Sequence, residues 1–283
     1  MRYAEIAPHP SLRPHVERIW ILQGAGSDAG DSEQVLPDGR SELIFHLGDP
    51  FLRLDGPSGP QPQSPVLAAG QIRGPLPLKP SGVVDVVGVR LSPAGGRTLL
   101  DAPASELAGL TIDLESLWGG EAHELLARMQ DTPRDDGRVD LLEHSLMRRL
   151  GTSRRRDAGI EWAVAEIEAA CGRVDLAELA RTLGRSRRQL ERRFAAQVGL
   201  SPRTFARIIR FRRAVGAVRA LPAGEPPAWV DVALSCGYFD QSHMIRDFRE
   251  FAGVPPRAFV RQPRSLSDLM SHSSKTDSPG PRV

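Results

Sequence analysis

Two groups of hydrogen-bonding side chains recur about fifty residues apart, each on a segment whose apolar residues follow helical spacing. Each segment therefore predicts a helix with a buried back and a polar front. The major groove of DNA admits such a helix, and there Arg pairs with guanine, Gln with adenine and Glu with cytosine. The polar residues are Ser186, Arg187, Arg188, Glu191 and Arg192 in the first segment, and Gln241, Ser242, His243 and Arg246 in the second.

The second group requires a helix, a tight turn and another helix within Trp229–Pro256. Gly237 allows the turn, because glycine adopts positive φ without strain. Asp240 is placed to cap the second helix, and Gly253 followed by Pro255 ends it. The expected apolar positions are Val230, Val232, Ala233 and Leu234 in the first helix and Met244, Ile245, Phe248 and Phe251 in the second.

The first group follows the same pattern. A helix with Leu176, Leu179 and Ala180 on its apolar side precedes Gly184, and Ser186 caps the next helix, which ends at Gly199–Pro202. Between the two units, Thr204–Leu221 predicts one helix of about 17 residues, or roughly 25 Å. A spacer of this size holds two helices in successive major-groove segments, which lie about 34 Å apart.

Residues from about 158 to 262 resemble the DNA-binding domain of the AraC/XylS family of bacterial transcription regulators. The resemblance rests on the runs Asp231–Ala233, Gly237–His243, Phe248–Arg249 and Gly253–Phe259. It implies seven helices, sequence-specific binding of double-stranded promoter DNA and contact with RNA polymerase. Family habit favours transcription activation and a homodimer, but the sequence decides neither activator versus repressor nor the oligomeric state. The resemblance also assigns base reading to Arg188, Glu191 and Arg192 and to Gln241, Ser242, His243 and Arg246.

The charge of the chain is unevenly distributed. Residues 158–264 hold 18 Arg and Lys against 11 Asp and Glu, whereas residues 1–157 hold 17 against 22. A basic module attached to an acidic one suits DNA binding by the basic part, although solvated surface charge gives the same counts. The chain has no Asn, so bidentate adenine reading falls to Gln.

The predicted fold class is α+β, with a β-rich, barrel-like N-terminal domain, trailing helices and an all-α C-terminal domain. The expected divisions are a sensor domain over 1–150, a linker over 151–157, the DNA-binding domain over 158–264 and a disordered tail over 265–283. No secretory or membrane-spanning pattern occurs, which predicts a cytoplasmic protein. Strands are expected at His15–Gly24, Ser41–Leu47, Phe51–Leu54, Val66–Ile72, Leu76–Lys79 and Val83–Leu91. After Gly96 the pattern becomes helical: helices are expected at Gly96–Leu100, Ala104–Ala108, Gly120–Met129 and Val139–Leu150, and Ile112–Trp118 leads into the third.

The runs Leu36–Gly48, Val87–Gly96 and Pro103–Leu107 resemble an N-terminal domain found ahead of some AraC-type modules. The resemblance implies a compact sensor for a small-molecule effector, which the sequence does not identify. Arg40 and Arg90 can hold a carboxylate or phosphate by forked hydrogen bonds, or can instead pair with Glu42 as ordinary structure. The candidate effector-binding residues are Trp20, Asp38, Arg40, Glu42, His46 and Arg90.

Catalytic and metal-binding patterns are missing from the sequence. There is no G-x-S-x-G, Walker or H-E-x-x-H pattern, and the two cysteines, Cys171 and Cys236, are isolated. We therefore expect no enzyme activity, no metal and no cofactor. Two alternatives remain open: a catalytically active N-terminal domain fused to a DNA module, and an architectural protein that contacts phosphates through Arg with little sequence preference.

Overall fold

The structure, a computed structural model, describes residues 1–25, 32–56, 58–151, 156–221 and 228–262. The predicted tail over 265–283 and most of the predicted linker lie outside the described residues. Among the described residues, no helix is both long and apolar enough to cross a membrane.

The N-terminal half contains two antiparallel sheets, which confirms the α+β class. The six-stranded sheet has the order β1 (Arg2–Ile6), β2 (Val16–Ala25), β9 (Val83–Leu91), β4 (Glu42–His46), β7 (Val66–Ala69) and β10 (Thr111–Asp113). The four-stranded sheet has the order β3 (Glu33–Val35), β8 (Leu76–Lys79), β5 (Leu52–Arg53) and β6 (Gln61–Pro62). Within the described part of the chain, no strand pairing joins the two sheets, so they do not form a closed barrel.

Side chains along β4 point alternately to the two faces of the six-stranded sheet, and each face covers a separate part of the interior of this half. Leu43 and Phe45 are fully buried in the core beneath the helices, whereas Ile44 and its neighbours on the other face point between the two sheets. The helices on this side are α1 (Gly96–Leu100), α2 (Ala104–Leu107), α3 (Glu115–Trp118), α4 (Glu121–Gln130) and α5 (Asp135–Gly151). The six-stranded sheet therefore has a helical layer on one face and the smaller sheet on the other.

The six expected strand segments each contain a strand, but β1, β3, β6 and β10 were not expected. The expectation that the pattern is helical after Gly96 fails at Thr111–Asp113, which form β10 and pair with β7. Pairing across sequence-distant strands overrides the local helical pattern at this place.

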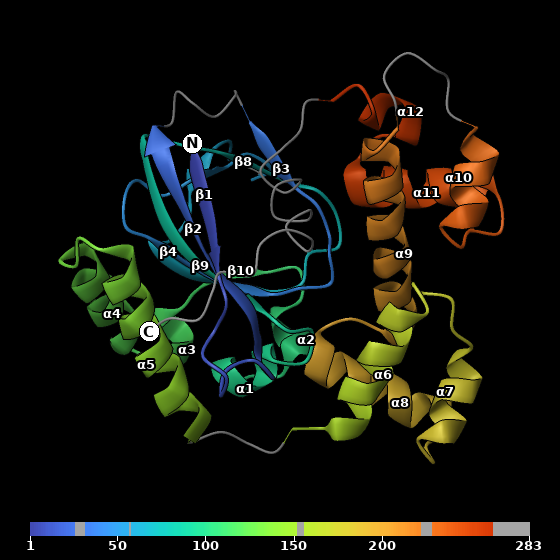
Figure 1. The fold of residues 1–283 in the computed structure, drawn as a ribbon, viewed down its shortest axis with the longest axis horizontal. Coiled ribbons are helices and arrows are strands. Elements are labelled where there is room, and N and C mark those ends of the chain that lie inside the picture. The colour runs from blue at the N-terminus through green and yellow to red at the C-terminus, as the bar shows by residue number, and fades with distance from the viewer. Residues whose placement is uncertain (26–31, 57, 152–155, 222–227, 263–283) are drawn as a thin grey trace.

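The C-terminal half consists, within its described residues, of seven helices, as expected. They are α6 (Ala158–Ala169), α7 (Leu176–Thr182), α8 (Arg187–Val198), α9 (Pro202–Arg219), α10 (Trp229–Ser235), α11 (Gln241–Ala252) and α12 (Pro256–Phe259). Figure 1 shows α9 as a long helix with α6–α8 at one end and α10–α12 at the other. A shared core of phenylalanines joins both ends to α9: Phe194, Phe205, Phe211, Phe248, Phe251 and Phe259.

The apolar face of α10 differs from the prediction. Val230 and Leu234 are 53% and 51% exposed, while Trp229 and Ala233 face the core. In this seven-residue helix the buried side is one i, i+4 pair, and the adjacent pair therefore points to solvent. Cys171 lies in the turn after α6, at φ 51°.

Candidate nucleic-acid interface and effector cavity

The N-terminus of α8 is fixed by a capping box. Ser186 Oγ accepts the Gln189 N–H at 3.3 Å, and Gln189 Oε1 accepts the Ser186 N–H at 2.9 Å. Leu190 is fully buried behind this turn. Arg188 and Arg192 are exposed, and the described residues contain no ion-pair partner for either. Both side chains are therefore available to a ligand.

Two other charged residues of α8 already have partners. Arg187 Nε lies 3.1 Å from Glu191 Oε1 in an exposed i, i+4 pair, which contributes little and can break on binding. Arg193 pairs with Asp157, with Nη2 2.6 Å from Oδ2, while its side chain stays 50% exposed. Of the α8 arginines, Arg188 and Arg192 are therefore the two without an ion pair among the described residues.

The N-terminus of α11 is capped by Asp240, whose Oδ1 accepts the His243 N–H at 2.7 Å. The His243 ring meets the Tyr238 ring edge-on, with centroids 5.2 Å apart. Burial and nearby arginines lower the pKa of His243, so its imidazole is neutral and offers one donor and one acceptor. Ser242 and Arg246 are exposed and Gln241 is half-buried, so the expected reading residues occupy the first two turns of α11.

A buried ion pair fixes α11 against α9. Asp247 is fully buried, and its Oδ1 lies 2.7 Å from Arg207 Nη2. The same guanidinium contacts Glu250 Oε2 at 2.5 Å. Because Arg207 comes from α9, these contacts hold the orientation of α11 relative to the connecting helix.

A cavity of about 100 Å³ lies between the two sheets. All six of the residues proposed for effector binding line it: Trp20, Asp38, Arg40, Glu42, His46 and Arg90. The Trp20 indole occupies the space above Gly88, where an added Cβ would come within 2.0 Å of the ring. Much of the remaining wall is apolar, formed by Leu22, Phe51, Leu76, Leu78 and Val86.

The two cavity arginines are held by carboxylates. Arg90 donates to Glu42 Oε1 at 3.1 Å and Glu17 Oε2 at 3.3 Å, and also pairs with Asp38. Arg40 Nε lies 2.6 Å from Glu17 Oε1. The expected alternative, in which Glu42 pairs with an arginine as structure, is therefore the arrangement present for Arg90.

Glu17 was missed by the sequence reasoning. The pairing of β2 with β9 shifts register between Val16 and Arg18, so Glu17 lies at an irregularity. A bulge re-aims its side chain, and here it points the carboxylate toward both arginines. Its only sequence signal is an acidic residue at the start of an apolar strand.

Burial changes the protonation of two cavity groups. It raises the pKa of Glu42 to about 7, because Arg90 offsets only part of the desolvation. It lowers the pKa of His46 to about 4, with Gln63 acting in the opposite direction. Burial would also raise the pKa of Asp38, but Arg90, Arg212 and Arg40 together hold it below its usual value. Near neutral pH His46 is thus uncharged, while Asp38 stays ionised.

The segment Leu36–Arg40, here called the coupling loop, belongs to the cavity wall and also contacts the helical domain. Gly39, at φ 79°, lies so close to Phe205 of α9 that an added Cβ would come within 2.7 Å of its ring. The Asp38 carbonyl accepts from Arg212 of α9 at 3.3 Å. Arg40 Nη2 contacts Glu168 of α6 at 2.6 Å. The loop therefore joins the cavity to two helices of the other half.

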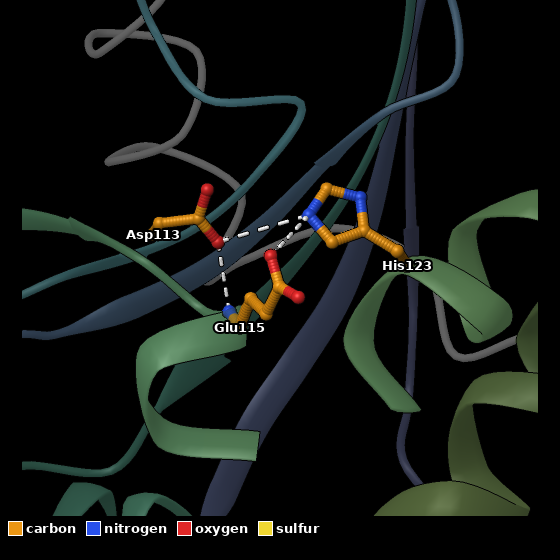
Figure 2. Close-up of side chains that lie close together, drawn as sticks. All are labelled: Asp113, Glu115 and His123. Atoms are coloured by element: carbon orange, nitrogen blue, oxygen red, sulfur yellow. Dashed lines mark hydrogen bonds and ion pairs between the residues drawn. The ribbon is translucent and has the colours of Figure 1, made fainter. Parts of the chain in front are cut away.

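Figure 2 shows a further group of polar side chains, outside the cavity. His123 Nε2 lies 3.5 Å from Glu115 Oε2 and 3.9 Å from Asp113 Oδ1. Asp113 Oδ1 also accepts the Glu115 N–H at 2.8 Å. Sequence reasoning did not anticipate this contact, since the strand and helices that assemble it are distinct elements. All three side chains are substantially exposed.

Two tandem helix-turn-helix units on one connecting helix define a DNA-binding protein class. Residues 179–262 match the family described as helix-turn-helix domain, and residues 4–113 match a domain of unknown function, DUF6597. The helix-turn-helix match lies within the C-terminal segment whose sequence resembles the AraC-type domain.

The chain is 37% identical over 84 residues to the HTH-type transcriptional regulator GbdR of Pseudomonas aeruginosa, covering 30% of this chain and 22% of that protein. It is 38% identical over 77 residues to the HTH-type transcriptional regulator MtrA of Neisseria gonorrhoeae, covering 27% and 24%. The chain thus spans less than a quarter of the length of these curated relatives. Among solved structures, ToxT from Vibrio cholerae is 11% identical, with coverage of 86% and 97% and a TM-score of 0.45.

Proposed function

We propose that the protein is a sequence-specific, DNA-binding transcription regulator whose N-terminal cavity binds a small-molecule effector. The observation that carries this function is the placement of two capped, donor-rich helices at the two ends of α9 (Figure 1). The 18 residues of α9 span roughly 27 Å, close to the rise of about 34 Å between successive major-groove segments.

In this function α8 reads the first groove segment. Arg188 and Arg192 bind guanine edges, and Glu191 accepts from cytosine once its pair with Arg187 opens. Ser186 and Arg187 lie at the helix N-terminus, where contact with phosphate is favourable.

The second groove segment belongs to α11, through Gln241, Ser242, His243 and Arg246. These groups provide hydrogen bonds in addition to charge, which favours base reading over general phosphate binding. The protein acts in the cytoplasm by binding alone, without catalysis, and influences transcription through RNA polymerase at the bound promoter.

Effector control proceeds through the coupling loop. Its residues line the cavity and also contact α6 and α9, so a change at the cavity wall alters the restraint on the DNA-binding domain. An effector bound in the cavity shifts the affinity for DNA only to the extent that it favours one arrangement of this interface over another.

The test is selection of bound sequences from a random DNA pool with the full chain, followed by affinity measurements on the selected site and on random DNA. Arg192→Ala should lose about 1–3 kcal/mol on the selected site and relax base preference at one position. Arg148→Ala, which removes an exposed arginine of α5, is the matched control and should change neither affinity. Equal loss on both DNAs would make Arg192 a phosphate contact. If the selection enriches no sequence, the protein is better explained as an architectural one.

A further inference from the structure

We propose that the cavity between the two sheets takes a compact, uncharged molecule with a hydroxyl or carbonyl group, and that it excludes carboxylates and phosphates. This inference rests on the proposed function, since it concerns the effector of the same cavity. It departs from the expectation that the cavity arginines hold an anion.

The cavity size limits the ligand to about one ring. Its volume of about 100 Å³ is smaller than the roughly 150 Å³ of a dry engineered cavity that accepts benzene, but this cavity is partly open, so one ring is the upper limit of ligand size. Aliphatic and aromatic side chains from both sheets form much of the wall. Burial of apolar surface is therefore the main source of affinity.

Among the described residues, each arginine on the cavity wall already has a carboxylate partner and is not free for an anionic ligand. All three guanidinium nitrogens of Arg90 have a carboxylate partner: Glu17 at Nε, Glu42 at Nη1 and Asp38 at Nη2. Arg40 is held between Glu17 and Glu168. An incoming carboxylate would have to displace one of these groups and leave it buried without its partner, which is costly.

The charge of the whole cluster leads to the same conclusion. Its cations are Arg40, Arg90 and Arg212, and its carboxylates are Glu17, Asp38, Glu42 and Glu168. Three positive charges thus face up to four negative ones, and the pKa of Glu42 near 7 lets that site lose its charge at little cost. An added anion would meet no surplus of positive charge.

Two buried polar groups on the cavity wall lack a hydrogen bond of regular geometry among the described residues. They are Trp20 Nε1, in a side chain 4% exposed, and the ring nitrogens of His46, which is 2% exposed and has the Gln63 side chain beside it. The indole N–H is a donor, and a neutral imidazole offers one donor and one acceptor. Leaving such groups unpaired is costly, so a ligand that pairs with them gains affinity. A hydroxyl can accept from one and donate to the other, whereas a carbonyl accepts from either.

The experiment compares three one-ring probes by calorimetry with the full chain: benzyl alcohol, benzoate and benzylammonium. They share a ring and differ in charge. Benzyl alcohol should bind at least tenfold more tightly than either ion. Tighter binding of benzoate or benzylammonium would overturn the inference, as would failure of all three to saturate at millimolar concentration.

Two variants test the residues. Trp20→Phe keeps an aromatic wall but removes the N–H, and should weaken benzyl alcohol binding about five- to tenfold. Trp162→Phe, on the surface of α6, is the matched control and should leave it unchanged. Glu42→Gln releases part of Arg90 and should strengthen benzoate binding about tenfold or more. Unchanged benzoate binding in Glu42→Gln, or an unchanged alcohol affinity in Trp20→Phe, would contradict the assignment.

These binding measurements are made without DNA, so a result that contradicts the ligand preference leaves the proposed DNA-binding function unaffected. Conversely, loss of sequence selectivity in the DNA selection would refute the regulator function while the ligand preference of the cavity still stood.

Discussion

Asp157 links three parts of the DNA-binding domain, and its replacement should destabilise that domain measurably. Its carboxylate accepts the Ile160 N–H at 3.3 Å as the cap of α6. It also pairs with Arg185 at 3.2 Å and with Arg193 of α8 at 2.6 Å. The Asp157 side chain is only 7% exposed, so water replaces these contacts poorly.

The expected loss for Asp157→Ala is about 2–4 kcal/mol. The cap contributes about 1 kcal/mol. The pair with Arg185 contributes about 1–2 kcal/mol as a partly buried, charge-assisted bond. The Arg193 side chain is 50% exposed, so its pair is screened and adds less than about 1 kcal/mol. Asp157→Asn keeps an acceptor for the cap and should therefore lose about 1–2 kcal/mol.

Urea unfolding of the full chain measures these losses, with Trp162 on α6 as a fluorescent reporter. Burial would raise the pKa of Asp157, but Arg193 and Arg185 lower it below the usual 3.8. A carboxyl group whose pKa is lower in the folded than in the unfolded protein stabilises the fold at pH values above its unfolded-state pKa. This stabilisation is lost as the pH falls through its folded-state pKa. The gap between wild type and Asp157→Ala should thus be constant near neutral pH and shrink only below about pH 4.

Two results would refute this reasoning. A loss of less than about 0.5 kcal/mol for Asp157→Ala would show that the contacts are replaced by water. Equal stability of wild type and Asp157→Asn would show that the two ion pairs contribute nothing and that the cap alone acts.

Four further substitutions test other contacts. Burial lowers the pKa of His46 to about 4, so the free energy of unfolding should fall by about 3 kcal/mol as the pH drops from 6.5 toward 4. In urea unfolding, His46→Leu should flatten this part of the pH profile. Arg207→Met leaves fully buried Asp247 without its cation and should cost about 3–5 kcal/mol of unfolding free energy. Glu250→Gln removes only the exposed partner and should cost less than about 1 kcal/mol, so equal losses would contradict the buried-pair argument. Asp240→Ala removes the cap of α11 and should cost about 1 kcal/mol, with weaker binding to selected DNA in a gel-shift titration; unchanged binding and stability would exclude a role for the cap.

The sequence by itself determined the local framework of the DNA-binding domain. Ser186 and Asp240 cap their helices as expected, and Gly237 takes the positive φ that its turn requires. These features depend on neighbours within four residues, so their physical cause is present in the linear pattern. Alternation along β4 likewise places Glu42 and His46 on the same face of a strand. Their role in effector binding stays a prediction.

Only the tertiary structure decided which charges meet. Arg90 contacts carboxylates from β2, from β4 and from the coupling loop, and strand register rather than local sequence brings them together. In the same way, Arg193 of α8 pairs with Asp157, and Arg40 pairs with Glu168 of α6. Such pairs form between segments that fold next to each other after local structure is set. The linear pattern contains the charged residues, but packing and register choose their partners.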